Sequence, residues 1–219
     1  MAGKQDIAFA AAEHERKGLG FSTSRLQKTA TADIDNLIKY LRIGPAMARY
    51  RTGLYYGPDG GAIGTQLLVE DALVVGPLMW EQFAVIEEIG IDVTTAGTEG
   101  NLYTVLYADR GDGYPGEAVH VSAALAVTAG FKSTTGLEIE LPPGLYWAGV
   151  VCNQVTTTVA TVRSVTGNSR FVGETAGAND VLLAGYSQAA VTGAPPTNFT
   201  DTVTPSAFAP RLLMKVKST

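Results

Sequence analysis

The residues that come closest to a catalytic arrangement lie around Ser187. An apolar run over 181–184 leads into Gly-Tyr-Ser-Gln-Ala at 185–189, and a strand that runs into Gly-x-Ser-x-small is how serine hydrolases present their nucleophile. The last position is Ala where that motif has Gly, and the fold needs its histidine after the serine. The two histidines of the chain, His14 and His120, both precede Ser187. We therefore expect Ser187 to be a turn or strand-end residue, and we expect no enzymatic activity.

Metal ligation has equally little support. His14, His120 and Cys152 are far apart in the sequence and show no ligand spacing. The segment Asp109-Arg110-Gly111-Asp112-Gly113 begins like a calcium loop. Counted from Asp109, however, a glycine falls at the third ligand position and His120 at the twelfth, where an EF-hand has a bidentate Glu. We expect a hairpin turn there, with no metal and no cofactor.

Aromatic side chains offer a different chemistry, because their rings can stack on sugars. Tyr55, Tyr56 and Tyr114 lie close to glycines and prolines and are our candidate glycan contacts. Tyr146 and Trp147 lie inside an expected strand, which favours a place in a core or an interface instead. Because these three tyrosines could stack on sugar rings, a carbohydrate-binding module is an alternative to a purely structural role.

The elements that would position these residues are β-strands. Residues 137–141 alternate apolar and polar, stop at Pro142-Pro143-Gly144, and resume in the strand formers of 145–148. This predicts two strands and their corner, with Glu138 and Glu140 facing water. Similar segments recur along the chain, and we expect strands over residues 53–57, 66–75, 83–93, 102–108, 118–127, 137–141, 145–152, 157–165, 181–185 and 212–216.

Few segments beyond residue 50 show a helical period, so a parallel α/β sheet is disfavoured. The sequence predicts a mainly β domain over 46–219, an antiparallel β-sandwich with jelly roll as the leading topology. Two segments, 153–177 and 188–210, show weak patterns and are expected to be largely long loops.

The N-terminal segment, 1–45, is predicted to be an attachment arm with one short helix at about 32–43. The helix is indicated by an apolar stripe at helical spacing and by Gly44-Pro45, which ends it. A helix this short needs a partner, since isolated helices require roughly 12–15 residues. The stripe either packs on the sandwich or joins copies of the chain, and its residues are our predicted assembly contacts: Ile34, Leu37, Ile38 and Leu41.

Composition and charge limit the partners. The 46% hydrophobic content suffices for a real core, and the net charge of −5 argues against nucleic acid. Residues 1–53 hold nine Lys/Arg against five Asp/Glu, a charge of +4, while the remainder holds seven against sixteen, a charge of −9. A basic arm could dock on an acidic surface, although ordinary scatter of surface charge explains the asymmetry equally well.

Cysteine usage and hydropathy add further expectations. Cys152 is the single cysteine, so no intrachain disulfide can form, and its apolar neighbours predict a buried small hydrophobe. The apolar stretch at 7–12 is too short for a secretory signal, and no segment reaches the ~20 apolar residues of a membrane span. We expect a soluble, unprocessed protein without a membrane partner.

Five segments stand out together along the chain: Ile89-Gly90-Ile91-Asp92-Val93-Thr94-Thr95-Ala96-Gly97, Leu106-Tyr107-Ala108-Asp109, Tyr114-Pro115-Gly116, Leu141-Pro142-Pro143-Gly144-Leu145-Tyr146-Trp147-Ala148 and Ala209-Pro210-Arg211-Leu212-Leu213. In their order and spacing they resemble the β-sandwich appendage domain of tailed-bacteriophage structural proteins. The resemblance covers roughly residues 55–216, and the Gly-Leu-Tyr-Trp corner is its most characteristic part.

The resemblance implies a component of the virion's external surface, commonly trimeric, of the minor tail protein, fibre-tip or head-fibre type. Other virion proteins would be its partners, and a host surface glycan a further one. The chain lacks the repetitive shaft of the longer fibres, and a helix gains ~1.5 Å per residue, so a compact attached knob is expected. We favour a tail appendage for host contact, with a head fibre or capsid decoration protein as the alternative.

Overall fold

The computed structural model describes residues 50–58, 62–153, 157–166, 172, 183–200 and 202–219. By its internal contacts the chain divides into two units, 1–47 and 48–219. The predicted arm, its helix and the stripe formed by Ile34, Leu37, Ile38 and Leu41 lie outside the described residues, as does the predicted boundary at 45. In the part of the chain that is described, no helix has the length and apolar character needed to cross a membrane.

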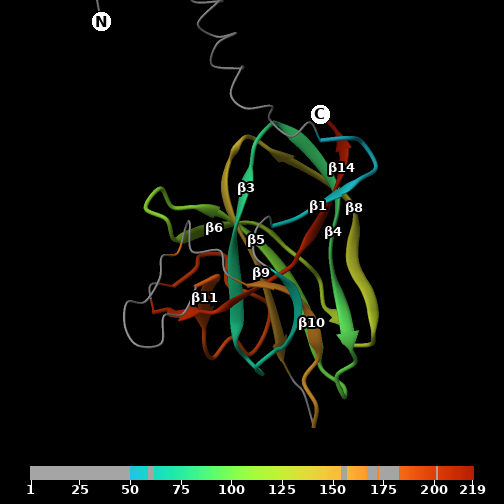
Figure 1. Cartoon of the computed structure of the whole chain (residues 1–219), viewed down its shortest axis with the longest axis vertical. Helices are drawn as coiled ribbons and strands as arrows, with labels where there is room; N and C mark the ends of the chain where they lie inside the picture. The colour runs from blue at the N-terminus through green and yellow to red at the C-terminus, as the bar shows by residue number, and fades with distance from the viewer. Residues whose placement is uncertain (1–49, 59–61, 154–156, 167–171, 173–182, 201) are drawn as a thin grey trace, which may run out of the picture. The chain divides into compact units, whose positions relative to one another are not determined.

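The described residues form a β-sandwich of two antiparallel sheets, as the sequence predicts (Figure 1). The first sheet, sheet A, has the order β1-β14-β4-β10-β13, with β2 paired to β10 and β8 paired to β4. Its strands are β1 (Tyr55–Tyr56), β2 (Ile63–Leu67), β4 (Ala84–Thr95), β8 (Gly130–Leu141), β10 (Thr161–Thr166), β13 (Phe208–Pro210) and β14 (Leu213–Ser218).

The second sheet, sheet B, has the order β12-β11-β3-β9-β5-β6, with β7 paired to β5. Its strands are β3 (Leu73–Trp80), β5 (Asn101–Asp109), β6 (Pro115–Val121), β7 (Leu125–Ala126), β9 (Gly144–Asn153), β11 (Gly185–Gln188) and β12 (Thr204–Ser206). Neighbours in a sheet are often distant in sequence: Leu73 of β3 pairs with Gln188 of β11.

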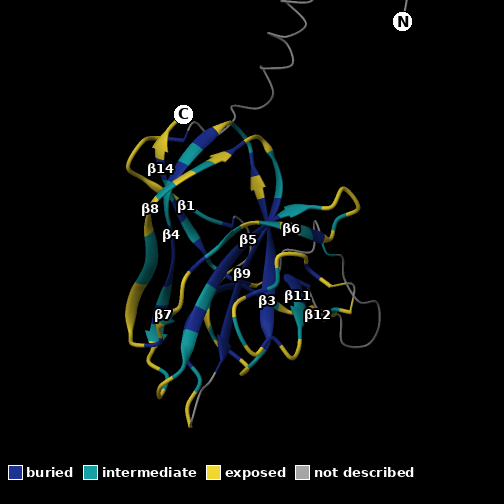
Figure 2. Ribbon diagram, turned by 180° about the vertical axis from the view of Figure 1, so that it is seen from behind, coloured by how far each residue is buried: buried dark blue, intermediate teal, exposed yellow. Residues whose placement is uncertain are grey.

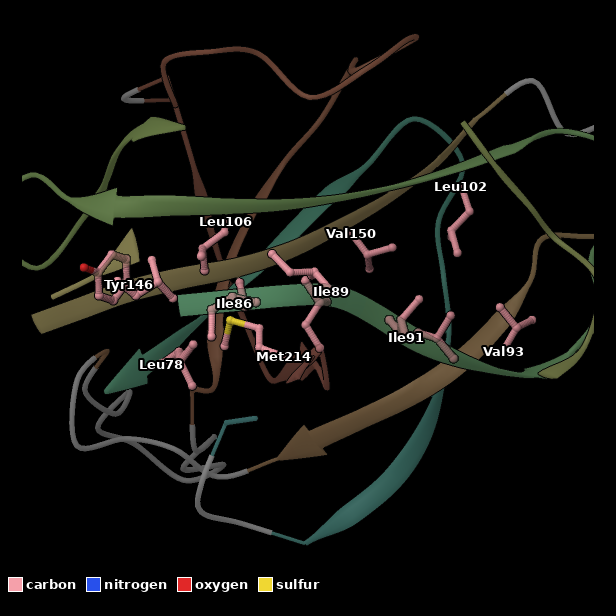
Figure 3. Close-up of a cluster of buried hydrophobic side chains, with 14 of the residues drawn as sticks. Leu78, Ile86, Ile89, Ile91, Val93, Leu102, Leu106, Tyr146, Val150 and Met214 are labelled. Atoms are coloured by element: carbon pink, nitrogen blue, oxygen red, sulfur yellow. The ribbon is translucent and has the colours of Figure 1, made fainter. Parts of the chain in front are cut away.

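The main core lies between the two sheets (Figure 3). From β4, Ile86, Ile89 and Ile91 point toward Leu106 of β5 and Val150 of β9, and all five are almost completely buried. The register of β4 against both neighbouring strands shifts between residues 86 and 88. This β-bulge explains why two isoleucines three positions apart both face inward while the two glutamates between them remain partly exposed.

Sheet B is buried on its outer face as well (Figure 2). Trp147 of β9 and Tyr107 of β5 point away from the main core and pack in a second cluster with Tyr186 and Phe199. The segment around β11 and residues 191–199 therefore covers this face. Burial on both faces accounts for the almost uninterrupted run of buried residues in β9.

The predicted Pro-Pro-Gly corner is confirmed. It joins β8 of sheet A to β9 of sheet B, and Glu138 and Glu140 are exposed while Leu141 is fully buried. The Tyr146 hydroxyl donates a hydrogen bond of 2.9 Å to the carbonyl of Pro142, which ties the corner to the following strand. Tyr146 and Trp147 are core residues, as expected.

Several strand predictions were wrong in extent; the expected strand 118–127, for example, is two strands, β6 and β7. The expected strand 66–75 is two strands, β2 and β3, because Asp71 takes a positive φ of 57° that no strand residue adopts. The strand expected at 137–141 begins seven residues earlier, at Gly130, and the one expected at 181–185 is described at Gly185–Gln188. The expected loop 188–210 contains the short strands β12 and β13.

Candidate functional site

A pocket of about 180 Å³ lies where β1 of sheet A approaches the end of β3 of sheet B. Tyr55 and Tyr56 reach it because β1 pairs with β14, placing Tyr55 opposite Lys215. The pocket is smaller than a usual small-molecule site of roughly 300–1,000 Å³, so it has room for a single ring. Four of its ten lining residues are aromatic, namely Tyr50, Tyr55, Tyr56 and Trp80, and Met79 and Arg211 line it as well.

Three of the wall's rings form a cluster. The ring of Tyr50 lies on Trp80 with centroids 4.1 Å apart and an interplanar angle of 26°, and Tyr56 approaches Tyr50 edge-on with centroids 4.6 Å apart. The Tyr50 hydroxyl accepts a hydrogen bond of 3.1 Å from the backbone N–H of Glu81, and that of Tyr56 accepts one of 2.8 Å from the N–H of Arg51. Hydrogen bonds thus hold two of the three rings, and the wall is preorganised.

The faces that a ligand could reach belong to other residues. Trp80 and Tyr50 are buried, whereas Tyr55 is 40% and Met79 is 46% exposed. The guanidinium of half-buried Arg211 forms no hydrogen bond or ion pair with another described residue, so this cation at the pocket can pair with an anion. The buried Trp80 Nε1 also has no acceptor in the described part of the chain.

Tyr55 is oriented by a carboxylate. Its hydroxyl donates a hydrogen bond of 2.6 Å to Oε2 of Glu88, and its ring meets Phe131 edge-on at 5.5 Å. This hydrogen bond, with smaller contributions from burial and from the charges of Glu88 and Glu87, raises the pKa of Tyr55 to about 12. Tyr55 therefore stays neutral and keeps its ring at the pocket rim across the physiological pH range.

Tyr114 belongs to a different site. It lies at the tip of the β5–β6 hairpin of sheet B and stacks on Tyr186, with centroids 4.9 Å apart and an interplanar angle of 18°. Tyr186 in turn packs on Trp147, and the Arg110 guanidinium lies 5.7 Å from the centroid of the Tyr114 ring. With 39% of Tyr114 exposed, this is an aromatic surface platform with a charged edge.

The hairpin below Tyr114 is the turn that the sequence predicts at 109–113. The N–H of Gly111 donates to Oδ2 of Asp109 at 2.8 Å, and Gly111 and Gly113 both have positive φ. Arg110 and Asp112 form an exposed ion pair of 2.8 Å that lowers the pKa of the Asp112 carboxyl. Asp109 and Asp112 are thus engaged by the turn itself.

The structure therefore brings together two of the three predicted glycan contacts. Tyr55 and Tyr56 share a pocket, and Tyr114 is not part of it. Sequence reasoning missed Tyr50, Trp80 and Arg211, which complete the pocket from three distant segments. The Met-Trp pair that ends the apolar run of β3 was the one local signal for the pocket.

The residues that the sequence offers for catalysis or metal binding do not come together in one site. Ser187 lies within β11, paired with Val74 and Thr204 rather than at the turn of a nucleophile elbow. His120 lies on β6, where desolvation lowers its pKa. Cys152 is completely buried, as predicted, and desolvation raises the pKa of its thiol. Among the described residues no three His, Cys, Asp or Glu side chains are grouped so that they could hold a metal ion.

Comparisons with known proteins give little to add. No protein-family model and no curated protein sequence matches the chain. Among solved structures the chain is similar to the cysteine protease and lectin-like domains of Cwp84, a surface layer associated protein of Clostridium difficile. The similarity has 13% sequence identity and a TM-score of 0.38, and it covers 70% of this chain and 36% of that one. We draw no functional conclusion from a similarity of this size.

Proposed function

We propose that the chain is a non-enzymatic structural protein of a bacteriophage virion, most simply a tail appendage that contacts the host surface. The observation that carries the proposal is where the phage-like segments fall. They fall on strands of both sheets and on the corner between them: the second half of β4, the end of β5, the start of β6, the β8–β9 corner, and β13 with the start of β14. The resemblance thus follows strands of both sheets, with Tyr114 in the β5–β6 hairpin.

The sandwich suits such a role physically. Core residues fill the space between the sheets, and the outer face of sheet B is covered by a second cluster. A domain with a core between its two sheets and a second cluster on the outer face of one sheet resists unfolding outside a cell. The loops at its ends are available for recognition. In this proposal, residues 1–45 attach the domain to other virion proteins, and the stripe of Ile34, Leu37, Ile38 and Leu41 joins copies, with a trimer favoured.

We also propose that the sandwich is jelly-roll-like. Most connections between successive long strands cross between the sheets: β3 to β4, β4 to β5, β8 to β9 and β9 to β10 cross, whereas β5 to β6 stays within sheet B. Such crossing between the two layers is what a jelly roll requires. Head fibre or capsid decoration is the alternative position on the particle, since either would use the same domain.

The proposal is tested on the phage that encodes this chain. Particles purified on a density gradient should contain the protein, and imaging at a resolution that places the chain should locate it on the external surface of the tail. Location on the head would select the alternative position. Absence from intact particles that infect normally would contradict the proposal.

The role of the arm is tested separately. Deleting residues 1–44 should leave a folded sandwich, because the core described above uses residues from Tyr50 onward, and should prevent incorporation into particles. Leu37→Asp with Leu41→Asp should have the same effect, whereas Asn36→Ala with Lys39→Ala, off the stripe, should incorporate normally. Normal copy number of the truncated protein would contradict attachment through the arm.

Carbohydrate recognition is the second candidate, and the pocket is the observation that favours it. A sugar ring could stack on the exposed face of Tyr55, and an acidic group on the sugar could pair with Arg211. Glycan-array binding should be reduced by Tyr55→Ala, and binding of acidic glycans in particular by Arg211→Ala. Tyr114→Ala is the matched control, since Tyr114 lies outside the pocket. If Tyr114→Ala alone abolishes binding, the hairpin platform is the site and the pocket is not.

A further inference from the structure

Strand β2 is an edge strand whose open side has a regular pattern. It pairs with β10, and no other described strand pairs with it. The N–H of Thr166 donates to the carbonyl of Ala62, and the N–H of Leu68 donates to the carbonyl of Ala160. In an antiparallel ladder, alternate residues carry these bonds. The backbone groups of the even-numbered residues therefore point to β10, and those of Ile63, Thr65 and Leu67 point to the open edge.

Two of these residues, Ile63 and Leu67, present apolar side chains to solvent. Ile63 is 59%, Leu67 is 54% and Val69, which continues the row, is 62% exposed, and Thr65 between them is exposed as well. Exposed edges normally carry charge or proline, which discourage pairing with another chain. Of the other described edge strands longer than three residues, β6 contains Pro115 and Glu117, and β8 contains Lys132, Glu138 and Glu140. Strand β2 contains no charge and no proline.

We propose that β2 pairs antiparallel with β2 of a second copy of this chain about a two-fold axis through Thr65. The residues whose backbone groups point to the open edge are symmetric in kind about Thr65, with an apolar residue on either side. Thr65 would lie opposite Thr65 of the other copy, and Ile63 opposite Leu67 twice. This register uses the three outward N–H groups and places the apolar side chains of one copy beside those of the other.

The charges beside β2 and the symmetry of the contact are compatible with a second copy of the chain at this edge. Arg163 of β10 lies directly beside Thr65, and its charge is paired with Asp92 at 3.2 Å, so like charges are not left facing each other across the axis. A two-fold contact also uses each β2 edge once, so the contact itself closes on two copies of the sandwich. The contact is short compared with stable interfaces, which bury at least about 1,200 Å² in total. We therefore expect weak pairing in solution that becomes effective where copies are concentrated.

The first test is association of the full-length chain. Sedimentation velocity over a range of concentrations should show the mass doubling, whatever contacts join copies elsewhere, and Thr65→Lys should abolish the doubling. Thr65→Pro should do the same with the fold intact, because it removes an N–H that points to the open edge. Thr135→Lys, an exposed position on edge strand β8, is the matched control and should still double. Thermal unfolding checks that each variant is folded.

The second test fixes the register. Residues opposite each other in a hydrogen-bonded antiparallel pair have Cα atoms about 5.5 Å apart, within disulfide range. Thr65→Cys should therefore form an interchain disulfide under mild oxidation, and Leu67→Cys, which would face Ile63, should form far less. The native Cys152 is buried and does not interfere. A folded Thr65→Lys variant that still doubles, a chain that never doubles, or a Thr65→Cys variant that cross-links no better than Thr135→Cys would each overturn the proposal.

Discussion

The ring of Tyr50 lies on the indole of Trp80 at a centroid separation of 4.1 Å, joining the start of the described chain to the end of β3. Tyr50→Ala should cost about 3–5 kcal/mol of unfolding free energy, as loss of a buried aromatic ring does. Tyr50→Phe keeps the stack and loses the bond from the Glu81 N–H, so it should cost about 1 kcal/mol. Urea unfolding with an unchanged m-value measures the loss of unfolding free energy in both variants. If Tyr50→Phe and Tyr50→Ala lose the same free energy, the stacked ring contributes nothing to stability.

Gly76 of β3 faces Ala209 of β13 so closely that a Cβ on Gly76 would lie 2.2 Å from the Cβ of Ala209. Gly76→Ala should therefore destabilise the sandwich by about 1–3 kcal/mol or more through overpacking. Adding Ala209→Gly should recover much of the loss, which a double-mutant cycle in denaturant would measure. Gly64→Ala is the control, because the nearest atom to its Cβ would be 4.0 Å away. If the effects of Gly76→Ala and Ala209→Gly on the unfolding free energy are strictly additive, the two residues do not contact each other.

Tyr55 should titrate late because of its hydrogen bond to Glu88. Its pKa is raised from the ordinary value of 10.0 to about 12, so its contribution to stability is fully present below pH 10 and is lost as the pH rises through 12. Glu88→Gln should return the titration of this tyrosine toward 10. The difference in tyrosinate absorbance between each background and its Tyr55→Phe variant isolates this one phenol. An identical difference curve in both backgrounds would rule out control by Glu88.

Asp109 holds two groups at the hairpin: the indole N–H of Trp147 donates to Oδ1 at 2.9 Å, and the N–H of Gly111 donates to Oδ2 at 2.8 Å. Asp109→Ala should cost about 1–3 kcal/mol, because it leaves the donor of buried Trp147 unpaired. Asp109→Asn keeps one acceptor and should cost less. Asp112→Ala, at an exposed ion pair, should leave stability unchanged. Denaturant midpoints followed by tryptophan emission compare the stability of the three variants. If Asp109→Ala leaves the midpoint unchanged, Asp109 does not stabilise the hairpin.

Local sequence chemistry was enough to predict the elements that depend on few residues. The alternation before Pro142-Pro143-Gly144 predicted a strand, a corner and a strand, because period-two burial and turn stereochemistry are decided within a dozen residues. The turn at Asp109–Gly113 and the buried state of Cys152 were predictable for the same reason. The arm and its helix stripe stay predictions, since they lie outside the described residues.

Tertiary structure alone decided how these elements meet. The sequence grouped Tyr55, Tyr56 and Tyr114, yet strand pairing places the first two at a pocket with Trp80 and the third on a hairpin of the other sheet. Likewise, the short strand β13 forms because it packs on β10 and beside Gly76, far away in sequence. Which strands become neighbours depends on burial summed over the whole domain, and no local pattern contains that sum.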